Sequence, residues 1–486
     1  MSWTPEIALI AALVIPLTGG LFVGLLGKYP NLREGATLTA AVLLAVNVAY
    51  LVSVTGERPE LIYEIGSTGL SFGLKLEPLG ALFAAVASGL WIVNSIYSIG
   101  YMRGNKETHQ TRFFFFFTIA IAGAMGVALA SNLLTMFLFY EALTLSTYPL
   151  VAHKGDAKAR RGAAIYLSIL LGTSIGLFLP AIIATQFIAG STDFTVGGLL
   201  NGQASPLVAS VLLVLFAFGI GKAALMPVHP WLPNAMVAPT PVSALLHAVA
   251  VVKAGVFSIL KVSTYIFGPE LIQAAPASNW LAWIAAISIV LASIIAMSSN
   301  NLKRRLAFST VSQLSYVTLG AMIAAPLALL GAALQIVMHA WGKITLFMCA
   351  GAIYTASKKT EISDMRGLGR LMPWTFGAFA VGAFAIIGLP PFGGMWPKLF
   401  LMMGAASTGQ LALIGALILS SILNVAYLLP IPGRGFFDPA PKEGLKQPGP
   451  LLVVLPPVIT AAGVTILFFL IGPLTEFLAP VFGVEL

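Results

Sequence analysis

The sequence of 486 residues has one cysteine, Cys349, and only 9% charged residues. A single cysteine cannot form a disulfide framework, a cysteine-ligated zinc site or an iron–sulfur cluster held by this chain alone. Charged residues make up about a quarter of soluble proteins, so 9% charged against 58% hydrophobic residues excludes an ordinary soluble protein. Neither a GxxxxGKS loop nor a GxGxxG loop in a strand–helix context occurs, which argues against a nucleotide site of either kind.

What the sequence does have is a series of apolar runs, each of about 20 residues, which is the length that crosses a bilayer. We therefore predict an all-α polytopic membrane protein with about fourteen transmembrane helices. The predicted segments are 7–26, 35–54, 78–101, 113–130, 133–151, 163–188, 207–226, 238–265, 279–298, 304–323, 326–356, 373–403, 409–430 and 450–472.

The loops between these segments divide the basic residues unequally. Nineteen Lys and Arg fall in the loops on one side of the membrane, and only Arg58 and Lys75 fall on the other. Because basic loops face the cytoplasm, we predict a multi-pass protein of the cell membrane whose N- and C-termini are both extracytoplasmic. The basic residues left inside or at the end of predicted helices are Lys222, Lys253, Lys261, Lys343 and Lys398.

These lysines are costly, because each one at a helix centre costs roughly 2.5–3.5 kcal/mol. They are expected to face a polar or hydrated interior, where lysine, unlike arginine, can give up its proton. The pattern therefore predicts proton carriers. Snorkelling to the membrane interface is the alternative for Lys222, and it is the preferred interpretation for Lys261, which receives no function.

The other titratable residues of the predicted helices are Glu141, His247 and His339. Glu141 is expected about 14 Å deep, with Thr144 and Tyr148 on the same face as hydrogen-bond partners. The alternative for Glu141 is a structural counter-charge between two helices, and for His247 a packing role. His339 and Lys343 are four residues apart, but no acid or cysteine accompanies them, so we expect no metal and no cofactor.

Two predicted helices, 207–226 and 373–403, are interrupted next to a lysine. Pro227, Pro230 and Pro233 follow Lys222, and GLPPFGGMWP precedes Lys398. Broken helices at membrane depth are typical of transporters built from inverted repeats. We therefore predict two inverted five-helix repeats, 113–265 and 266–430, between N-terminal helices in 1–112 and a C-terminal loop and helix in 431–486.

Several segments also resemble one known family: FLFYEALTLSTYPLV, GKAALMPVHPWLPNAMVAPTPVSALLHAVAVVKAGVF, NLKRRLAFSTVSQLSYV, HAWGKITLF and GLPPFGGMWPK. They are similar to the antiporter-like, proton-conducting subunits shared by complex I, membrane-bound hydrogenases and Mrp-type multisubunit cation/proton antiporters. By length the chain is most similar to the D-type member of the Mrp antiporters. It departs from the family in having Tyr140 where many members have Trp, and in ending soon after the last segment, without the long lateral helix of complex I's distal subunit.

The resemblance implies a proton pathway formed by Glu141, Lys222, His247, Lys253, His339, Lys343 and Lys398. In it, Lys222 pairs with Glu141 near the entry half-channel and Lys253 links the two halves. Lys343 lies at the centre of the second half, Lys398 lies near the exit, and the two histidines assist along the axis.

Three hypotheses remain for the host of this pathway. The first is a subunit of an Mrp-type Na⁺/H⁺ antiporter, in which the chain is no enzyme and has other membrane subunits, protons and a monovalent cation as partners. The alternative is a proton-pumping subunit of a redox-driven complex-I-like or hydrogenase-like complex. A scaffold that has lost transport is the third, and the retained lysines and Glu141 argue against it.

Overall fold

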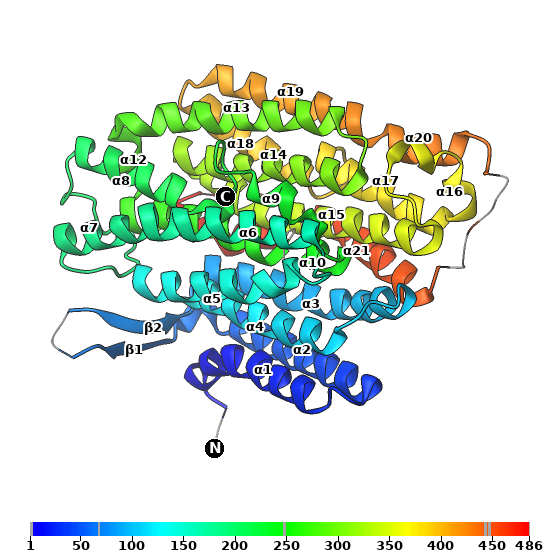
Figure 1. Cartoon of the computed structure of the whole chain (residues 1–486). Coiled ribbons are helices and arrows are strands. Elements are labelled where there is room, and N and C mark those ends of the chain that lie inside the picture. Colours follow the sequence, from blue (N-terminus) through cyan, green and yellow to red (C-terminus); the bar gives the residue numbers. More distant parts are fainter. Residues whose placement is uncertain (1–2, 67–68, 246–248, 442–444, 446–448, 486) are drawn as a thin grey trace.

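The computed structural model describes residues 3–66, 69–245, 249–441, 445 and 449–485. Long helices lie side by side along a common direction, with α1 at one edge of the bundle and α13 and α19 at the opposite edge (Figure 1). The elements of the first half are α1 (Pro5–Leu25), α2 (Pro30–Ser53), β1 (Glu60–Glu64), β2 (Ser71–Lys75), α3 (Pro78–Gly104), α4 (Gln110–Leu129), α5 (Leu133–Val151), α6 (Ala157–Thr173), α7 (Leu179–Ala189), α8 (Pro206–Gly219), α9 (Trp231–Asn234), α10 (Thr240–Leu245) and α11 (Val251–Val262).

The second half contains α12 (Pro269–Ala274), α13 (Pro276–Ser298), α14 (Leu302–Ile323), α15 (Pro326–Ser357), α16 (Leu368–Leu371), α17 (Pro373–Ile387), α18 (Met395–Ser407), α19 (Leu411–Leu428), α20 (Pro430–Phe437), α21 (Leu451–Phe469) and α22 (Ile471–Phe482). Many of these helices begin with proline at their first position, where its missing N–H costs nothing. Asn132, Asp156 and Asn301 cap α5, α6 and α14 with their side chains.

The prediction of an all-α polytopic membrane protein is confirmed. In the described part of the chain, eleven helices are long and apolar enough to cross a membrane, and three shorter apolar helices accompany them. The total of fourteen and the inverted repeats remain predictions. Residues 246–248, inside the predicted segment 238–265, lie outside the described residues.

The centre of the bundle is formed by α14 and α15. In the most apolar stretch of each helix, the share of residues that are buried inside the protein is 100% for α14 and 94% for α15. The corresponding share is 44% for α1 and 33% for α21. Polar and charged side chains on α14 and α15 are therefore shielded from lipid by their neighbours, whereas α1 and α21 present much of their surface outward.

Both expected helix breaks are present. The first follows α8, where the chain turns through a short 3₁₀ segment (Gly221–Ala223) before α9. The second lies between α17 and α18, where Gly388 adopts a φ of +89° and ends α17. Glycine is suited to this position because a side chain would meet Lys398 and because L-residues rarely adopt that φ.

Three features were not predicted. One is the antiparallel hairpin of β1 and β2, in which Glu60 lies opposite Lys75. An isolated β-bridge between Leu74 of β2 and Ala130 connects the hairpin to the loop between α4 and α5. Another is a π-helical turn after each of α6 and α11, at Ser174–Phe178 and Ser263–Phe267. The third is α22, which continues the chain beyond α21 and packs against α3 and α15.

The start of α2 corrects the placement of Arg33, which the sequence assigned to a loop. The helix begins at Pro30, and both Arg33 and Glu34 are buried in its first turns. Arg33 donates to Gln110 Oε1 at 2.9 Å and to Thr111 Oγ1 at 3.2 Å, while Glu34 forms an ion pair with Arg103. These partners compensate the buried charges, so a basic residue can enter the helix end.

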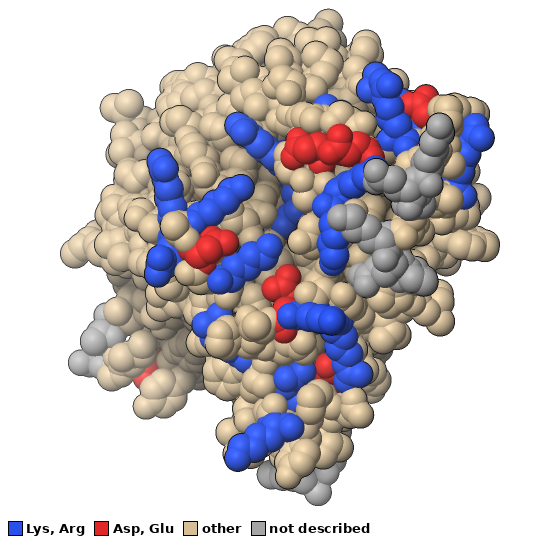
Figure 2. Space-filling model, turned by 45° about the vertical axis from the view of Figure 1, so that its right-hand side comes forward, with Lys and Arg blue, Asp and Glu red and all other residues tan. Residues whose placement is uncertain are grey.

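Lysine and arginine side chains crowd one end of the bundle, which faces the viewer in Figure 2. This is the end that lies to the right in Figure 1, away from the hairpin. The crowding agrees with the unequal distribution of basic residues in the sequence, and we refer to it below as the basic end.

His153, in the loop after α5, predicts that stability depends on pH. The side chain is buried, and burial together with the nearby Arg112 lowers its pKa from 6.5 to about 4. Between pH 6.5 and about 4, His153 binds a proton in the unfolded chain but stays neutral in the folded chain. This contribution to stability is therefore complete above pH 6.5, and about 3 kcal/mol of it is lost as the pH drops toward 4.

The measurement is the unfolding midpoint of the purified chain in mild detergent between pH 7.5 and 4.5. A His153→Gln variant is expected to flatten this dependence, whereas His109→Gln, at an exposed position and only a minor cause of the His153 shift, should change it little. Identical pH profiles for wild type and His153→Gln would show that His153 is not responsible.

Candidate functional site

Lys222 lies in the break after α8, and it is fully buried. Its amine donates to the carbonyl oxygen of Tyr140 at 2.8 Å and to Thr144 Oγ1 at 2.5 Å, and it sits 3.1 Å from the centroid of the Tyr140 ring. Its backbone N–H also donates to the Tyr140 hydroxyl. The snorkelling alternative is therefore wrong, because the amine is held against α5 inside the protein.

Glu141 lies beside this contact but takes no part in it. The structure shows no ion pair between Glu141 and Lys222, although the resemblance implies one. Thr144, the expected partner of Glu141, instead bonds Tyr140 and Lys222, and Tyr148 is 37% exposed. Both carboxylate oxygens of Glu141 are buried without a hydrogen-bond partner among the described residues. A buried carboxylate without a partner is unfavourable, so Glu141 has to be hydrated, protonated or approached by a cationic side chain that changes its position.

Close packing of backbones brings α11 against the Lys222 break. A side chain at Gly255 would lie 2.3 Å from the Lys222 carbonyl carbon, so only glycine permits this approach. Lys253, two residues earlier on α11, is fully buried. The glycine thus places two lysine-bearing segments next to each other in the interior.

The Lys253 amine contacts Nδ1 of His339, which comes from the central helix α15. One of these two nitrogens must donate and the other accept, so the contact holds one hydrogen-bonding proton between them. His339 Nε2 is buried and has no partner among the described residues. Lys343 follows one helical turn later on the same face of α15. The structure therefore brings Lys253, His339 and Lys343 together.

A row of hydrogen bonds continues from Lys343. Its amine donates to Ser309 Oγ at 2.5 Å, and Tyr427 connects Ser309 (2.7 Å) with Asn424 Oδ1 (2.5 Å). Asn424 donates to the carbonyl oxygen of Ile386 at 3.4 Å. All of these polar side chains are buried. The row links α14, α15 and α19 to the broken helix α17.

Lys398 completes the row from the other side of the α17–α18 break. Its amine donates to the carbonyl oxygens of Ile386 (3.0 Å) and Ile387 (2.7 Å) and to Ser421 Oγ (2.9 Å). The last carbonyls of a helix have no partner within it. Ending α17 at Gly388 thus creates acceptors for Lys398, and the Ile386 oxygen is shared by Asn424 and Lys398.

The Ser309–Tyr427–Asn424 link was not predicted from the sequence, and neither was Ser421. The available signal was the presence of hydroxyl and amide side chains within the otherwise apolar segments 304–323 and 409–430. His247, by contrast, was predicted as a site residue but lies outside the described residues.

Lys261 corrects another prediction, since it does not snorkel. It is fully buried and forms an ion pair with Glu77, the residue that precedes α3. Its amine also donates to the carbonyl oxygen of Ala130 at 2.8 Å and lies 4.4 Å from the centroid of Phe194. Burial is possible because a carboxylate, a carbonyl and an aromatic ring surround the charge.

The sequence pattern of the transmembrane region described as NADH:quinone oxidoreductase/Mrp antiporter matches residues 130–424. Residues 62–114 match the pattern of the N-terminus of chain 5 of NADH-ubiquinone oxidoreductase, complex I. The chain belongs to this antiporter-like family. The resemblance noted from the motifs is thereby confirmed.

Relatives come from both kinds of host. The N subunit of the NADH-quinone oxidoreductase of Desulforudis audaxviator is 30% identical over 92% of this chain and 88% of its own length. Chain 5 of the NAD(P)H-quinone oxidoreductase of a Picosynechococcus strain is 30% identical over 79% of this chain and 61% of its own length. The A/B subunit of a probable K⁺/H⁺ antiporter of Rhizobium meliloti is 31% identical over 79% of this chain but 38% of its own length.

Solved structures share the fold at low identity. A chain of an archaeal membrane-bound sulfane sulfur reductase gives a TM-score of 0.86 at 21% identity, covering 98% of this chain and 97% of that one. The Mrp complex of Dietzia gives 0.86 at 20%, covering 98% and 96%. Respiratory complex I of Thermus thermophilus gives 0.84 at 20%, covering 97% and 98%.

One prediction is overturned by these relatives. The sequence led us to expect a secondary-transporter subunit that is no part of an enzyme, whereas the first relatives are subunits of NADH-quinone and NAD(P)H-quinone oxidoreductases. The reason is that buried lysines and broken helices describe a path for protons but contain no information on what drives them.

Proposed function

We propose that the chain is a proton-translocating membrane subunit of a redox-driven, quinone-reducing complex of the complex I type. One observation carries the proposal. The buried Lys253 contacts His339, and Lys343 follows one helical turn later on the same helix as His339. From Lys343 a row of hydrogen bonds passes through Ser309, Tyr427 and Asn424 to the Ile386 carbonyl, which also accepts from the buried Lys398. Lysine can exchange protons, and buried ionisable groups in membrane proteins are predominantly parts of ion pathways.

The relatives support the redox host over an independent antiporter. The N subunit of a quinone oxidoreductase matches the present chain over most of both lengths, whereas the antiporter relative is covered over 38% of its own length. In this proposal the redox centres and the quinone site reside in partner subunits. The chain has lateral neighbours in the cell membrane, and its basic end faces the cytoplasm, with both termini on the other side.

The two predicted repeats, 113–265 and 266–430, receive distinct roles. The first contains Glu141, Lys222 and Lys253, and the second contains the row from His339 to Lys398. We propose that protons enter through the first repeat and leave through the second. The Lys253–His339 contact is where titratable side chains of the two predicted repeats touch, and it supports a transfer of protons between them.

The test is to purify the complex through a tag on this chain in mild detergent and to identify its subunits by mass spectrometry. We expect hydrophilic subunits carrying flavin or iron–sulfur clusters, and a pH gradient in reconstituted vesicles that appears only during quinone reduction. Recovery of small hydrophobic partners alone, with cation-dependent proton exchange, would replace this proposal by an antiporter.

Tyr427 provides a specific test of the row of hydrogen bonds between Lys343 and Lys398. A Tyr427→Phe variant keeps the ring but removes the hydroxyl between Ser309 and Asn424. Losing one such hydrogen bond corresponds to about 1 kcal/mol, so we expect proton translocation to slow about fivefold. Initial rates of vesicle acidification measure the effect.

The matched control is Tyr97→Phe. Tyr97 is equally buried, and its hydroxyl donates to the carbonyl oxygen of Met348 at 3.1 Å, outside the row. It should leave the rate unchanged. Equal rates for the two variants would remove Tyr427 from the pathway.

A further inference from the structure

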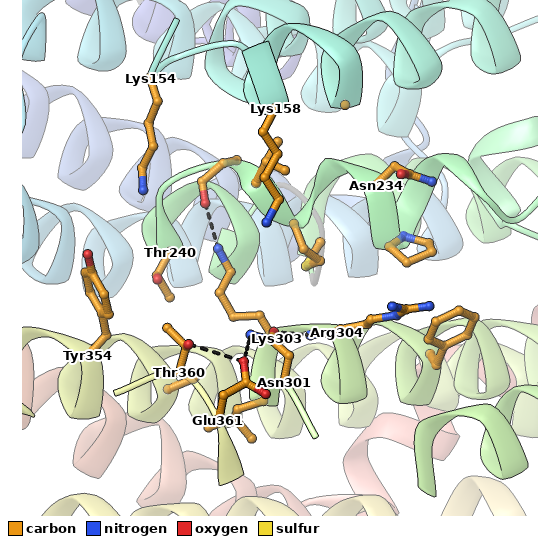
Figure 3. A pocket seen from close by; sticks show the side chains of 18 of the residues that line it. Lys154, Lys158, Asn234, Thr240, Asn301, Lys303, Arg304, Tyr354, Thr360 and Glu361 are labelled. Carbon is orange, nitrogen blue, oxygen red and sulfur yellow. Dashed lines mark hydrogen bonds between the residues drawn. The ribbon is translucent and has the colours of Figure 1, made fainter. Parts of the chain in front are cut away.

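A cavity of about 880 Å³ lies at the basic end, between α6 and α9 on one side and α14 and α15 on the other. Figure 3 shows Lys154 and Lys158 reaching toward it from one wall, with Lys303 on the facing wall. This volume is in the range of pockets that hold small ligands, about 300–1,000 Å³. Neither Lys253 and His339 nor any residue of the hydrogen-bonded row from Lys343 to Lys398 lines this cavity.

The cavity is lined by six basic residues, namely Lys154, Lys158, Arg161, Lys303, Arg304 and Lys359. None of the six forms an ion pair with a described residue. Lys303 donates to the carbonyl oxygen of Ala238 at 2.6 Å, and Arg304 lies 5.8 Å from the centroid of Phe308, so the contacts of both are with uncharged groups.

The described lining contains two acidic residues, Asp156 and Glu361, and each accepts a hydrogen bond from a group other than the six basic side chains. Asp156 caps α6 by accepting from the backbone N–H of Ala159 at 2.6 Å. Glu361 accepts from Asn301 Nδ2 at 2.9 Å. Both donors are uncharged and neither carboxylate forms an ion pair with a described residue, so the two negative charges offset only part of the charge of the six basic residues.

Two helix beginnings strengthen the positive potential. Lys158 lies in the first turn of α6, and Lys303 and Arg304 lie in the first turn of α14. The start of a helix is itself positive, so a basic residue there is unfavourable unless an anion is close. Placing basic side chains and helix starts around one cavity is the arrangement that binds anions.

We propose that this cavity binds a phosphate-bearing anion. Phosphate offers several acceptor oxygens and more than one negative charge, and it therefore matches several lysines and arginines better than a single carboxylate does. At the cytoplasmic membrane surface the phosphate comes either from the head group of an anionic phospholipid or from a soluble phosphate compound. Bound there, it connects the first predicted repeat, through α6, to the second, through α14.

The experiment is calorimetric titration of the purified full chain in mild non-ionic detergent. The probes are dioctanoyl phosphatidylglycerol, dioctanoyl phosphatidylcholine and inorganic pyrophosphate, each at about 50 and about 200 mM salt, because charge-driven binding weakens with screening. Binding of phosphatidylglycerol alone identifies a lipid site. Binding of pyrophosphate as well identifies a site for soluble phosphates.

The pocket variant is Lys158→Gln with Arg161→Gln, both at exposed positions, so folding is preserved. The control is Lys28→Gln with Lys106→Gln, which removes the same charge from exposed positions away from the cavity. We expect affinity to fall about tenfold or more in the pocket variant alone. No binding of any anionic probe, equal binding of phosphatidylcholine, or equal losses in both variants would overturn the proposal.

Discussion

Replacing Lys253 with Met is expected to abolish proton translocation while the complex still assembles. Lys253 contacts His339 across the boundary between α11 and α15, and no other described lysine has a hydrogen bond to His339. A proton-transferring side chain held in position contributes about 10²–10⁴-fold to a rate, so we expect at least a 100-fold loss. Met fills a similar volume without a charge, which limits the effect on packing.

A Lys253→Arg variant distinguishes proton exchange from fixed charge. Arginine keeps the positive charge but does not release its proton, so this variant should be as inactive as Lys253→Met. The measurement is acidification of vesicles during quinone reduction, with subunit recovery as the check on assembly. Lys28→Met, at an exposed position, is the control. Wild-type rates in Lys253→Arg would mean that Lys253 acts only as a fixed charge.

Local sequence signals predicted much of this site, because a charged residue within a membrane-spanning segment is costly and therefore rare. A lysine within a 20-residue apolar segment has few explanations, and Lys222, Lys253, Lys343 and Lys398 are all found inside the protein. Proline and glycine likewise marked both helix breaks, since their backbone preferences act on neighbouring residues.

Contacts between distant segments could not be predicted in this way. Lys261 looked like an interfacial lysine because its partner, Glu77, precedes a helix much earlier in the chain. Tyr427 was indistinguishable from a packing residue until its hydroxyl was found between Ser309 and Asn424. The absence of a Glu141–Lys222 ion pair also depends on side-chain positions, which motif spacing does not specify.

Breaking the Lys261–Glu77 ion pair is expected to give the largest loss of stability. Lys261→Met leaves the Glu77 carboxylate, only 7% exposed as a residue, without its cation. Removing one partner of a buried ion pair costs about 3–5 kcal/mol, because the remaining charge stays desolvated. The pair joins α11 to the start of α3, and the bond to Ala130 extends the connection to the end of α4. Unfolding in detergent titrated with denaturant measures the loss.

The hairpin supplies a matched control, because Lys75 and Glu60 form an ion pair at 3.2 Å whose side chains are 33% and 49% exposed. Lys75→Met should cost at most about 1 kcal/mol, since water already screens these charges. The double variant Lys261→Met with Glu77→Gln removes both buried charges and should recover part of the loss of Lys261→Met, because no carboxylate is then left uncompensated. A double variant no more stable than Lys261→Met would show that packing of the lysine stem, rather than the charge pair, stabilises this region.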